Sequence, residues 1–241
     1  PLPAKIDRFA ELGVERTYVF KFDRAFSQVT PDGFVSDVLL KLGVDTIVVG
    51  FDFTFGRGGA GTPDTLCGLA AGRFAVEVVR PVHLDGEKVS STLVRRQLKA
   101  GEMDRVSRLL GRRYQLTGKV VPGDARGRQI GFPTANIAPD APYVVPADGV
   151  YAVEVEWSGR TYPGVMNIGT RPTFDGNPER RTLEAHLFDF GQTIYGDTVK
   201  VEFVSRIRRE RKFASVDELV AQIRQDVETA KRILAGQAAG P

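Results

Sequence analysis

The spacing of apolar residues changes near the middle of the chain, and this change limits the possible folds more than any other feature. Before residue 110, short apolar runs alternate with stretches in which apolar residues recur at helical spacing. After that point, short segments alternate apolar and polar side chains and end in turn residues, which is typical of half-buried strands. We therefore predict two domains, over residues 1–110 and 111–241.

The first domain is expected to contain a parallel sheet flanked by helices. Helices are predicted over residues 6–12, 31–42, 91–98 and 104–110. Strands are predicted over residues 17–20, 46–49 and 74–79. The run Thr46-Ile47-Val48-Val49 is apolar throughout, which predicts burial on both faces. Helices placed between apolar strands indicate a parallel α/β sheet.

The second domain is expected to be a small antiparallel β-barrel closed by a C-terminal helix. Strands are predicted over residues 114–121, 149–157, 161–167, 182–189 and 199–207. Several strands at such short spacing favour a barrel. A single apolar stripe then predicts a helix over residues 216–233, and Ser215 with Glu218 forms a capping box at its start.

Composition excludes some classes of protein and site. The chain has 33 Lys and Arg against 30 Asp and Glu, so its net charge of +3 suits phosphate-bearing ligands without establishing a nucleic-acid binder. The single cysteine, Cys67, rules out an internal disulfide, and with two histidines it leaves little for zinc. Because no signal-peptide pattern or spanning run is found, we expect a cytoplasmic protein.

A loop rich in glycine and arginine, over residues 123–131, follows the predicted strand at residues 114–121. Gly123, Gly127 and Gly131 allow backbone N–H groups to turn toward an anion, and Arg126 and Arg128 add positive charge. The spacing matches neither a P-loop nor a dinucleotide-binding fingerprint. From these residues alone, a basic surface loop explains the segment better than a phosphate site does.

Thr134 and Asn136 follow this loop and lie two residues apart. On a strand, residues at this spacing face the same side. Their neutral oxygens suit Mg²⁺, a hard cation that keeps several waters and is held largely by substrate phosphates. A Thr and an Asn that only satisfy a turn remain the alternative.

Charged residues stand out in two segments of the second domain, the predicted strand that holds Glu184 and the basic run over residues 206–212. Glu184 alternates with Leu183, Ala185 and Leu187, so a carboxylate lies within a strand of otherwise apolar residues. Such a group can act as a general base toward a hydroxyl, or it can lie on a solvated face. The run from Arg206 to Lys212 holds five basic residues, which suit phosphate or nucleic acid, or a solvated strand end.

Two segments of the first domain lie where ligand loops are expected. Asp52 belongs to Gly50-Phe51-Asp52-Phe53-Thr54-Phe55-Gly56, directly after a predicted buried strand. Ser91 and Thr92 lie at a predicted helix start, where unsatisfied N–H groups bind anions. Core packing and ordinary capping explain the same residues.

Taken together, these segments resemble the bacterial bifunctional riboflavin kinase/FMN adenylyltransferase (FAD synthetase) family along nearly the whole chain. The resemblance is carried by Gly-Phe-Asp-Phe-Thr-Phe-Gly, Val-Ser-Ser-Thr-Leu-Val-Arg, Gly-Arg-Gln-Ile-Gly-Phe-Pro-Thr-Ala-Asn-Ile, Asn-Ile-Gly-Thr-Arg-Pro-Thr-Phe, Glu-Ala-His-Leu-Phe-Asp-Phe and Ile-Tyr-Gly. It implies a partial nucleotidyltransferase-type α/β domain followed by a kinase barrel. The barrel would phosphorylate riboflavin to FMN with ATP and Mg²⁺, and the first domain would adenylylate FMN to FAD.

The resemblance also implies roles for individual residues. Glu184 falls at the position of the base that acts on the ribityl hydroxyl, and Thr134 and Asn136 fall at the metal and nucleotide contacts. The loop with Gly123, Arg126, Gly127, Arg128 and Gly131 covers the ATP phosphates, and Tyr195 is a further nucleotide candidate. Arg208 and Phe213 fall at flavin contacts of the kinase. In the adenylyltransferase half, Asp52 falls at a flavin loop, and Ser91, Thr92 and Arg95 fall at nucleotide positions.

One departure from the family pattern bears on the second activity. The first strand of the nucleotidyltransferase domain and its H-x-G-H-like turn have no counterpart in the sequence. Either the chain is a fragment of a longer protein or its first domain is inactive. Because that turn contributes to the ATP site, we expect adenylylation to be impaired in this chain. We expect small-molecule partners only, without nucleic acid or membrane, and leave the oligomeric state open. A nucleic-acid-binding β-barrel that uses the basic loops is the competing hypothesis.

Overall fold

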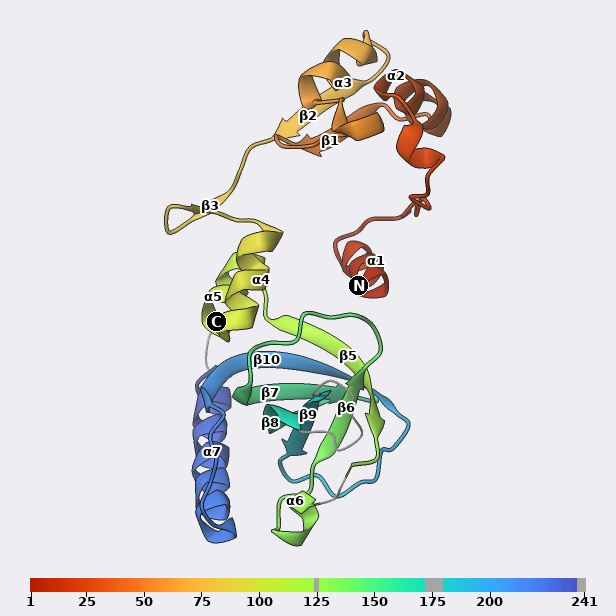
Figure 1. Ribbon diagram of the computed structural model, residues 1–241. Helices are drawn as coiled ribbons and strands as arrows, with labels where there is room; N and C mark the ends of the chain where they lie inside the picture. Colours follow the sequence, from red (N-terminus) through yellow and green to blue (C-terminus); the bar gives the residue numbers. More distant parts are fainter. Residues whose placement is uncertain (124–125, 172–179, 238–241) are drawn as a thin grey trace. The chain divides into compact units, whose positions relative to one another are not determined.

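The computed structural model describes residues 1–123, 126–171 and 180–237 (Figure 1). Contacts divide the chain into two compact units, one over Leu2–Val89 and a second that begins at Ser90. The helices α4 (Ser91–Ala100) and α5 (Met103–Leu110) group with the second unit, because Leu98, Met103 and Val106 are buried in its core. The domain boundary at residue 110 stays a prediction.

The first unit contains the predicted parallel sheet. Strands β1 (Thr46–Gly50) and β2 (Ala75–Val79) pair in parallel. The remaining elements are α1 (Leu2–Glu11), η1 (Phe26–Gln28), α2 (Pro31–Phe34), η2 (Val35–Leu39), η3 (Leu40–Leu42), η4 (Arg57–Gly59), α3 (Pro63–Ala70) and the hairpin strands β3 (His83–Leu84) and β4 (Glu87–Lys88). The α2–η3 segment ends at Gly43, whose φ of 65° is readily adopted by glycine.

Two predictions for this unit are wrong. Residues 17–20 form no strand, since no hydrogen-bonded neighbour strand lies beside them in the described part of the chain. The strand β1 is not buried on both faces, because Val49 is buried but Val48 is 60% exposed. Within the described residues β1 pairs only with β2, and its buried side packs against a small core that includes Val35, Phe55 and Leu66.

The second unit is a closed antiparallel barrel, and this confirms the predicted fold class. Its strands are β5 (Tyr114–Val121), β6 (Ala135–Pro139), β7 (Gly149–Trp157), β8 (Arg160–Arg171), β9 (Arg180–Leu187) and β10 (Thr198–Arg209), in the order β10-β5-β6-β9-β8-β7. All neighbouring pairs are antiparallel. The short helix α6 (Arg126–Gln129) lies between β5 and β6, and α7 (Val216–Gln237) lies along the side of the barrel (Figure 1).

Strand alternation creates two apolar layers in this unit. Residues such as Leu116, Val153 and Leu183 point inward and fill the barrel. On the outer face, Val150, Ala152, Val165 and Val204 pack against the apolar stripe of α7. The predicted cap of α7 is present, since the Glu218 N–H donates to the Ser215 hydroxyl at 3.2 Å. The Glu218 carboxylate accepts from the N–H of Ala214 rather than from that of Ser215.

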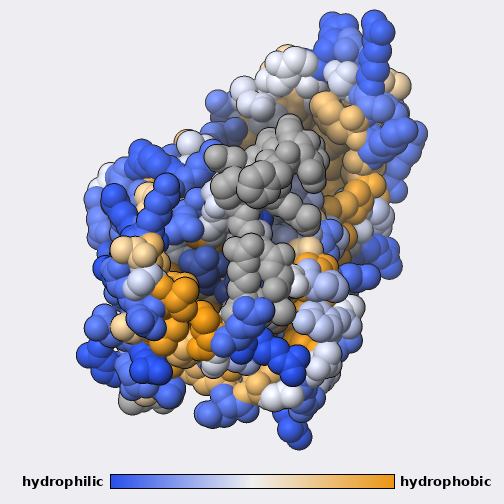
Figure 2. Space-filling model, turned by 60° about the horizontal axis from the view of Figure 1, so that its bottom comes forward, coloured by the Kyte–Doolittle hydropathy of each residue, from blue (hydrophilic) through white to orange (hydrophobic). Residues whose placement is uncertain are grey.

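The surface in Figure 2 is covered mostly by hydrophilic residues, with hydrophobic surface confined to patches between them. Across the described residues, no helix combines the length and the apolar character that crossing a membrane requires.

Two buried tyrosine hydroxyls predict a loss of stability at alkaline pH. Burial raises the pKa of Tyr114 and of Tyr151 from 10.0 to about 12, while their hydroxyls donate to the carbonyls of Val144 and Ala147. Because the folded pKa is the higher one, this stabilisation is complete below about pH 10 and is lost as the pH rises through about 12. At about pH 11, the free energy of unfolding should have fallen by about 1.4 kcal/mol more in the wild type than in Tyr151→Phe, relative to about pH 8. Urea unfolding followed by the fluorescence of the single tryptophan, Trp157, measures this difference, and equal losses would contradict the prediction.

Candidate active site

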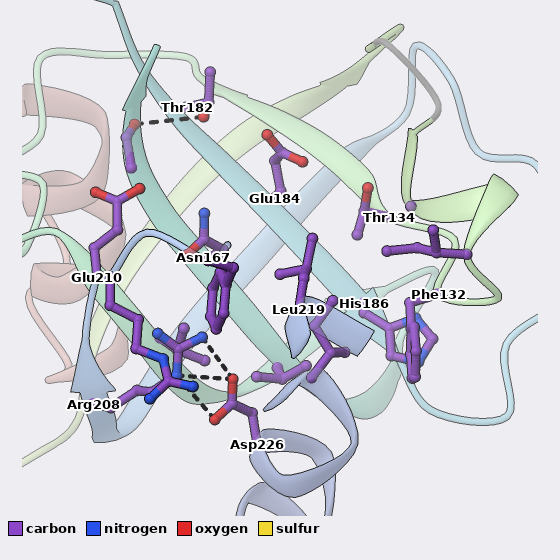
Figure 3. A pocket seen from close by; sticks show the side chains of 18 of the residues that line it. Phe132, Thr134, Asn167, Thr182, Glu184, His186, Arg208, Glu210, Leu219 and Asp226 are labelled. Carbon is purple, nitrogen blue, oxygen red and sulfur yellow. Dashed lines mark hydrogen bonds and ion pairs between the residues drawn. The ribbon is translucent and has the colours of Figure 1, made fainter. Parts of the chain in front are cut away.

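A cavity of about 360 Å³ opens between the outer face of the barrel and the start of α7 (Figure 3). Polar side chains of β8, β9 and the end of β10 form one part of its wall, among them Asn167, Glu184 and Arg208. Phe132, Val150, Val165, Phe213, Leu219 and Ile223 form an apolar part. A cavity of this kind, largely apolar with a few converging polar groups, suits a flat ring with polar substituents.

Glu184 lies in a row of polar residues that crosses three neighbouring strands. In the sheet register, Glu184 on β9 is directly opposite Asn136 on β6 and Asn167 on β8. The predicted alternation holds here: Leu183 and Ala185 are buried in the barrel, while Glu184 lines the outer cavity. Sequence reasoning did not assign Asn167 a role, although it belongs to a segment that carries the family resemblance.

His186 lies on the same side of β9 as Glu184 and is held by its surroundings. Its Nδ1 is 2.8 Å from the carbonyl oxygen of Pro133, and its ring packs edge-on against Phe132. These contacts fix one wall of the cavity next to Thr134.

A second cavity, of about 330 Å³, lies against the face of β9 that is opposite to Glu184 and His186. It is lined by Ala185 and Leu187, by Arg128 and Tyr195, and by Thr134. Thr134 also lines the first cavity, so this residue borders both cavities. The structure thus brings Thr134 near both Glu184 and two of the predicted nucleotide residues.

The glycine-rich loop packs directly on Thr134 and Asn136. A Cβ atom added to Gly123 would collide with the Asn136 amide, and one added to Gly127 would collide with the Phe132 carbonyl and lie 3.4 Å from the Thr134 hydroxyl. Gly131 has φ of 85°, which favours glycine. The side chain of Arg126, another predicted site residue, lies outside the described part of the structure, as do residues 172–179, which hold the end of the Asn167–Phe174 motif.

Arg208 is held in the first cavity by Asp226 of α7. Its Nε donates to both carboxylate oxygens at 3.0 Å, and its Nη2 donates to Oδ2 at 2.8 Å. Gln222 donates to the same carboxylate at 2.8 Å, and Asp226 is only 3% exposed. Sequence reasoning missed Asp226, although its spacing of three residues from Ile223 places an acidic residue on the buried face of the helix.

The basic run 206–212 is not a uniform charged surface. Arg206 donates to the backbone carbonyls of Ala100 and Asp148, and Arg208 is paired with Asp226. Arg208 and Arg211 lie 5.6 and 4.7 Å from the centre of the Phe213 ring. Since two of these arginines are engaged internally, the run offers little support for a nucleic-acid surface.

Thr134, Asn136 and Glu184 fit a magnesium ion better than a tightly bound transition metal. Thr134 and Asn136 carry neutral oxygens, and Glu184 lies opposite Asn136 in the sheet. No cluster of three His, Cys, Asp or Glu side chains able to hold a metal occurs in the ranges that the structure describes. Such a set of oxygens suits a cation that reaches the protein together with nucleotide phosphates.

The adenylyltransferase candidates are divided between the two units. Asp52 lies in the first unit, where Lys88 donates to its carboxylate at 2.7 Å and lowers its pKa. Ser91, Thr92 and Arg95 are exposed in the first turns of α4, in the second unit. The cap of α4 is Ser90, which accepts from the Leu93 N–H at 3.2 Å, so capping does not account for Ser91 and Thr92.

Comparison with known proteins agrees with this fold. The riboflavin kinase family model matches residues 110–234, and the FAD synthetase family model matches residues 1–93. The bifunctional riboflavin kinase/FMN adenylyltransferases of Bacillus subtilis and of Escherichia coli K12 are 42% and 43% identical to this chain. The matches cover 96% and 95% of this chain and 74% of each relative.

A similar solved structure is a crystal structure described as a macrolide-efflux protein from Streptococcus pneumoniae. It has a TM-score of 0.88 and 38% identity, covering 95% of this chain and 74% of its own. The fold is therefore that of a kinase barrel joined to a nucleotidyltransferase-type unit. The chain belongs to the bifunctional riboflavin kinase/FMN adenylyltransferase family.

Proposed function

We propose that the barrel unit transfers the γ-phosphoryl group of ATP to riboflavin, and that the chain's adenylyltransferase half takes part in converting FMN to FAD. The observation that carries the kinase assignment is the position of Thr134 at the junction of two cavities, with Glu184 in one and Arg128 and Tyr195 in the other. Phosphoryl transfer requires two substrates that meet at one point, and this arrangement supplies separate sites with a shared edge.

The two substrates differ in chemistry, and so do the two cavities. The first cavity holds Phe132, Phe213 and apolar residues of α7, which suit the isoalloxazine ring of a flavin. The second is bordered by Arg128 of the glycine-rich loop, which suits the phosphates of ATP. Riboflavin in the first cavity and ATP in the second would present the ribityl chain to the phosphates beside Thr134.

In this proposal Glu184 is the general base. Its carboxylate lies in the flavin cavity, on a strand whose rigid neighbours Asn136 and Asn167 stand directly opposite. A primary alcohol is a poor nucleophile, so a carboxylate that accepts its proton and aligns it with the γ-phosphate accelerates the transfer. Mg²⁺, held by Thr134 and Asn136 together with the phosphates, would neutralise charge that develops on the transferred group.

The direct test is a turnover assay with the purified chain. Riboflavin, ATP and Mg²⁺ are supplied, and FMN is followed by chromatography, with a parallel assay of FAD formation from FMN. ATP-dependent FMN formation is the expected result. A chain that binds neither riboflavin nor ATP, and forms no FMN, would contradict the proposal.

Thr134→Ala and Asn136→Ala should impair the use of Mg²⁺ and ATP more than the binding of riboflavin. Both side chains contribute oxygens next to the glycine-rich loop, and neither is part of the aromatic wall of the flavin cavity. We expect the KM for MgATP to rise by roughly 10-fold or more, because a hydrogen bond or ligand to a charged group contributes about 1.5–3 kcal/mol. Titrations of Mg²⁺ and ATP measure this change, and flavin fluorescence measures riboflavin binding. A selective loss of riboflavin affinity would contradict the assignment.

A further inference from the structure

Glu210 is a second acidic group in the flavin cavity, and the phosphoryl transfer described above does not use it. It follows the last residue of β10 and lines the same cavity as Arg208, two residues earlier. Its carboxylate lies against the backbone of β8, where a side chain on Gly169 would collide with it. Glycine at position 169 therefore leaves space for this carboxylate inside the cavity.

Among the side chains that the structure describes (residues 1–123, 127–170 and 181–236), none forms a hydrogen bond or ion pair with the Glu210 carboxylate. Burial and the nearby Asp148 carboxylate raise its pKa, while Arg208 and Arg181 oppose that rise. Asp148 is itself engaged by Arg181 and by the hydroxyl of Thr170, which donates to it at 2.9 Å. Glu210 is exposed and lines the cavity, so a donor on a ligand in the cavity can reach its carboxylate.

Arg208 supplies hydrogen-bond donors in the same cavity as the Glu210 acceptor. Its guanidinium is oriented by Asp226 and donates to the carbonyl of Arg209 at 3.0 Å. An arginine carries five N–H donors, so these contacts leave donors for a ligand. Figure 3 shows Arg208 and Glu210 on the same side of the cavity, across from Thr134, Phe132 and His186.

The Arg208 guanidinium, a donor, next to the Glu210 carboxylate, an acceptor, suits a ligand with an imide group. An imide presents a carbonyl oxygen beside an N–H group, so it accepts from one neighbour and donates to the next. The pyrimidine ring of a flavin has such an edge, with N3–H between two carbonyl groups. On the basis of the proposed function, we propose that Glu210 accepts the flavin N3–H while Arg208 donates to an adjacent flavin carbonyl, and that this pair selects ligands with an unsubstituted imide.

The proposal assigns specificity as well as affinity to Glu210. A site that is built to bond an N–H group discriminates against an analogue that lacks it, because its own polar group is then left unpaired. Hydrogen bonds to charged groups contribute about 1.5–3 kcal/mol, which corresponds to roughly 10- to 150-fold in affinity. Wild-type protein should therefore bind riboflavin at least about 10-fold more tightly than N3-methylriboflavin.

The test measures the binding of two ligands to the full wild-type chain and to three variants of it. Binding of riboflavin and of N3-methylriboflavin is measured by flavin fluorescence, without turnover, for wild type, Glu210→Ala and Glu210→Gln. In Glu210→Ala, riboflavin affinity should fall while N3-methylriboflavin affinity stays nearly the same, so that the discrimination disappears. Glu210→Gln should bind riboflavin more tightly than Glu210→Ala does, since an amide oxygen still accepts an N–H. Glu228→Ala, an exposed position on α7 away from the cavity, is the matched control.

The possible outcomes separate this inference from the function on which it rests. If wild type binds riboflavin and Glu210→Ala weakens both ligands equally, or neither, the role of Glu210 is overturned while the kinase assignment stands. If wild type binds no flavin at all, the proposed function fails and this inference fails with it. Loss of discrimination in Glu210→Ala, with part of it kept in Glu210→Gln and all of it kept in Glu228→Ala, would support the proposal.

Discussion

Glu184→Gln should nearly abolish riboflavin phosphorylation while ATP binding persists. The substitution keeps the size of the side chain and removes its ability to take a proton from the ribityl hydroxyl. Glu184 lines the first cavity and is paired in register with Asn136 and Asn167, so its position is set by the sheet rather than by a loop. A general base contributes about 10²–10⁴-fold in rate, and we expect kcat to fall by that factor.

The control for this experiment is a glutamate on the same barrel that lies outside both cavities. Glu156 on β7 forms a surface ion pair with Lys200 at 3.3 Å, and Glu156→Gln should leave FMN formation unchanged. ATP binding and riboflavin binding are measured for both variants, so that loss of a substrate is separated from loss of the chemical step. Turnover of Glu184→Gln close to that of wild type would remove Glu184 from the mechanism.

Asp226→Ala should destabilise the barrel unit by about 3 kcal/mol, and it should also weaken riboflavin binding. The carboxylate is 3% exposed and holds the Arg208 guanidinium through two nitrogens, so its removal leaves a largely covered positive charge without its partner. The same removal frees Arg208 to leave the cavity wall. Urea unfolding followed by Trp157 fluorescence measures the first effect, and flavin fluorescence measures the second.

A double variant separates the loss of the ion pair from general damage to the helix. In Asp226→Ala with Arg208→Met, no unpaired charge remains, so the double variant should be more stable than the sum of the two single losses predicts. Glu228→Ala, which removes an exposed pair with Lys231 on the same helix, should change stability by less than about 0.5 kcal/mol. Strictly additive losses for Asp226 and Arg208 would show that the pair does not couple as described.

Local patterns in the sequence predict most of the barrel unit. Strand alternation correctly separates Glu184 from its buried neighbours, and the apolar stripe with Ser215 correctly predicts α7 and its start. These features depend on residues only a few positions apart, so they can be read without knowing the fold. The same locality explains the error at residues 17–20, because a strand also requires a partner, which a local pattern does not provide.

The arrangement of the site is decided by the tertiary structure. No spacing in the sequence shows that Asn136, Glu184 and Asn167 share one row, since strand register arises from pairing between distant segments. Nor does it show that Thr134 borders two cavities or that Gly169 makes space for Glu210. By itself the sequence determined the family, the class of fold and the chemical types of the site residues. Only closure of the barrel and docking of α7 decided which of them meet, because side-chain proximity across strands depends on the packing of the whole unit.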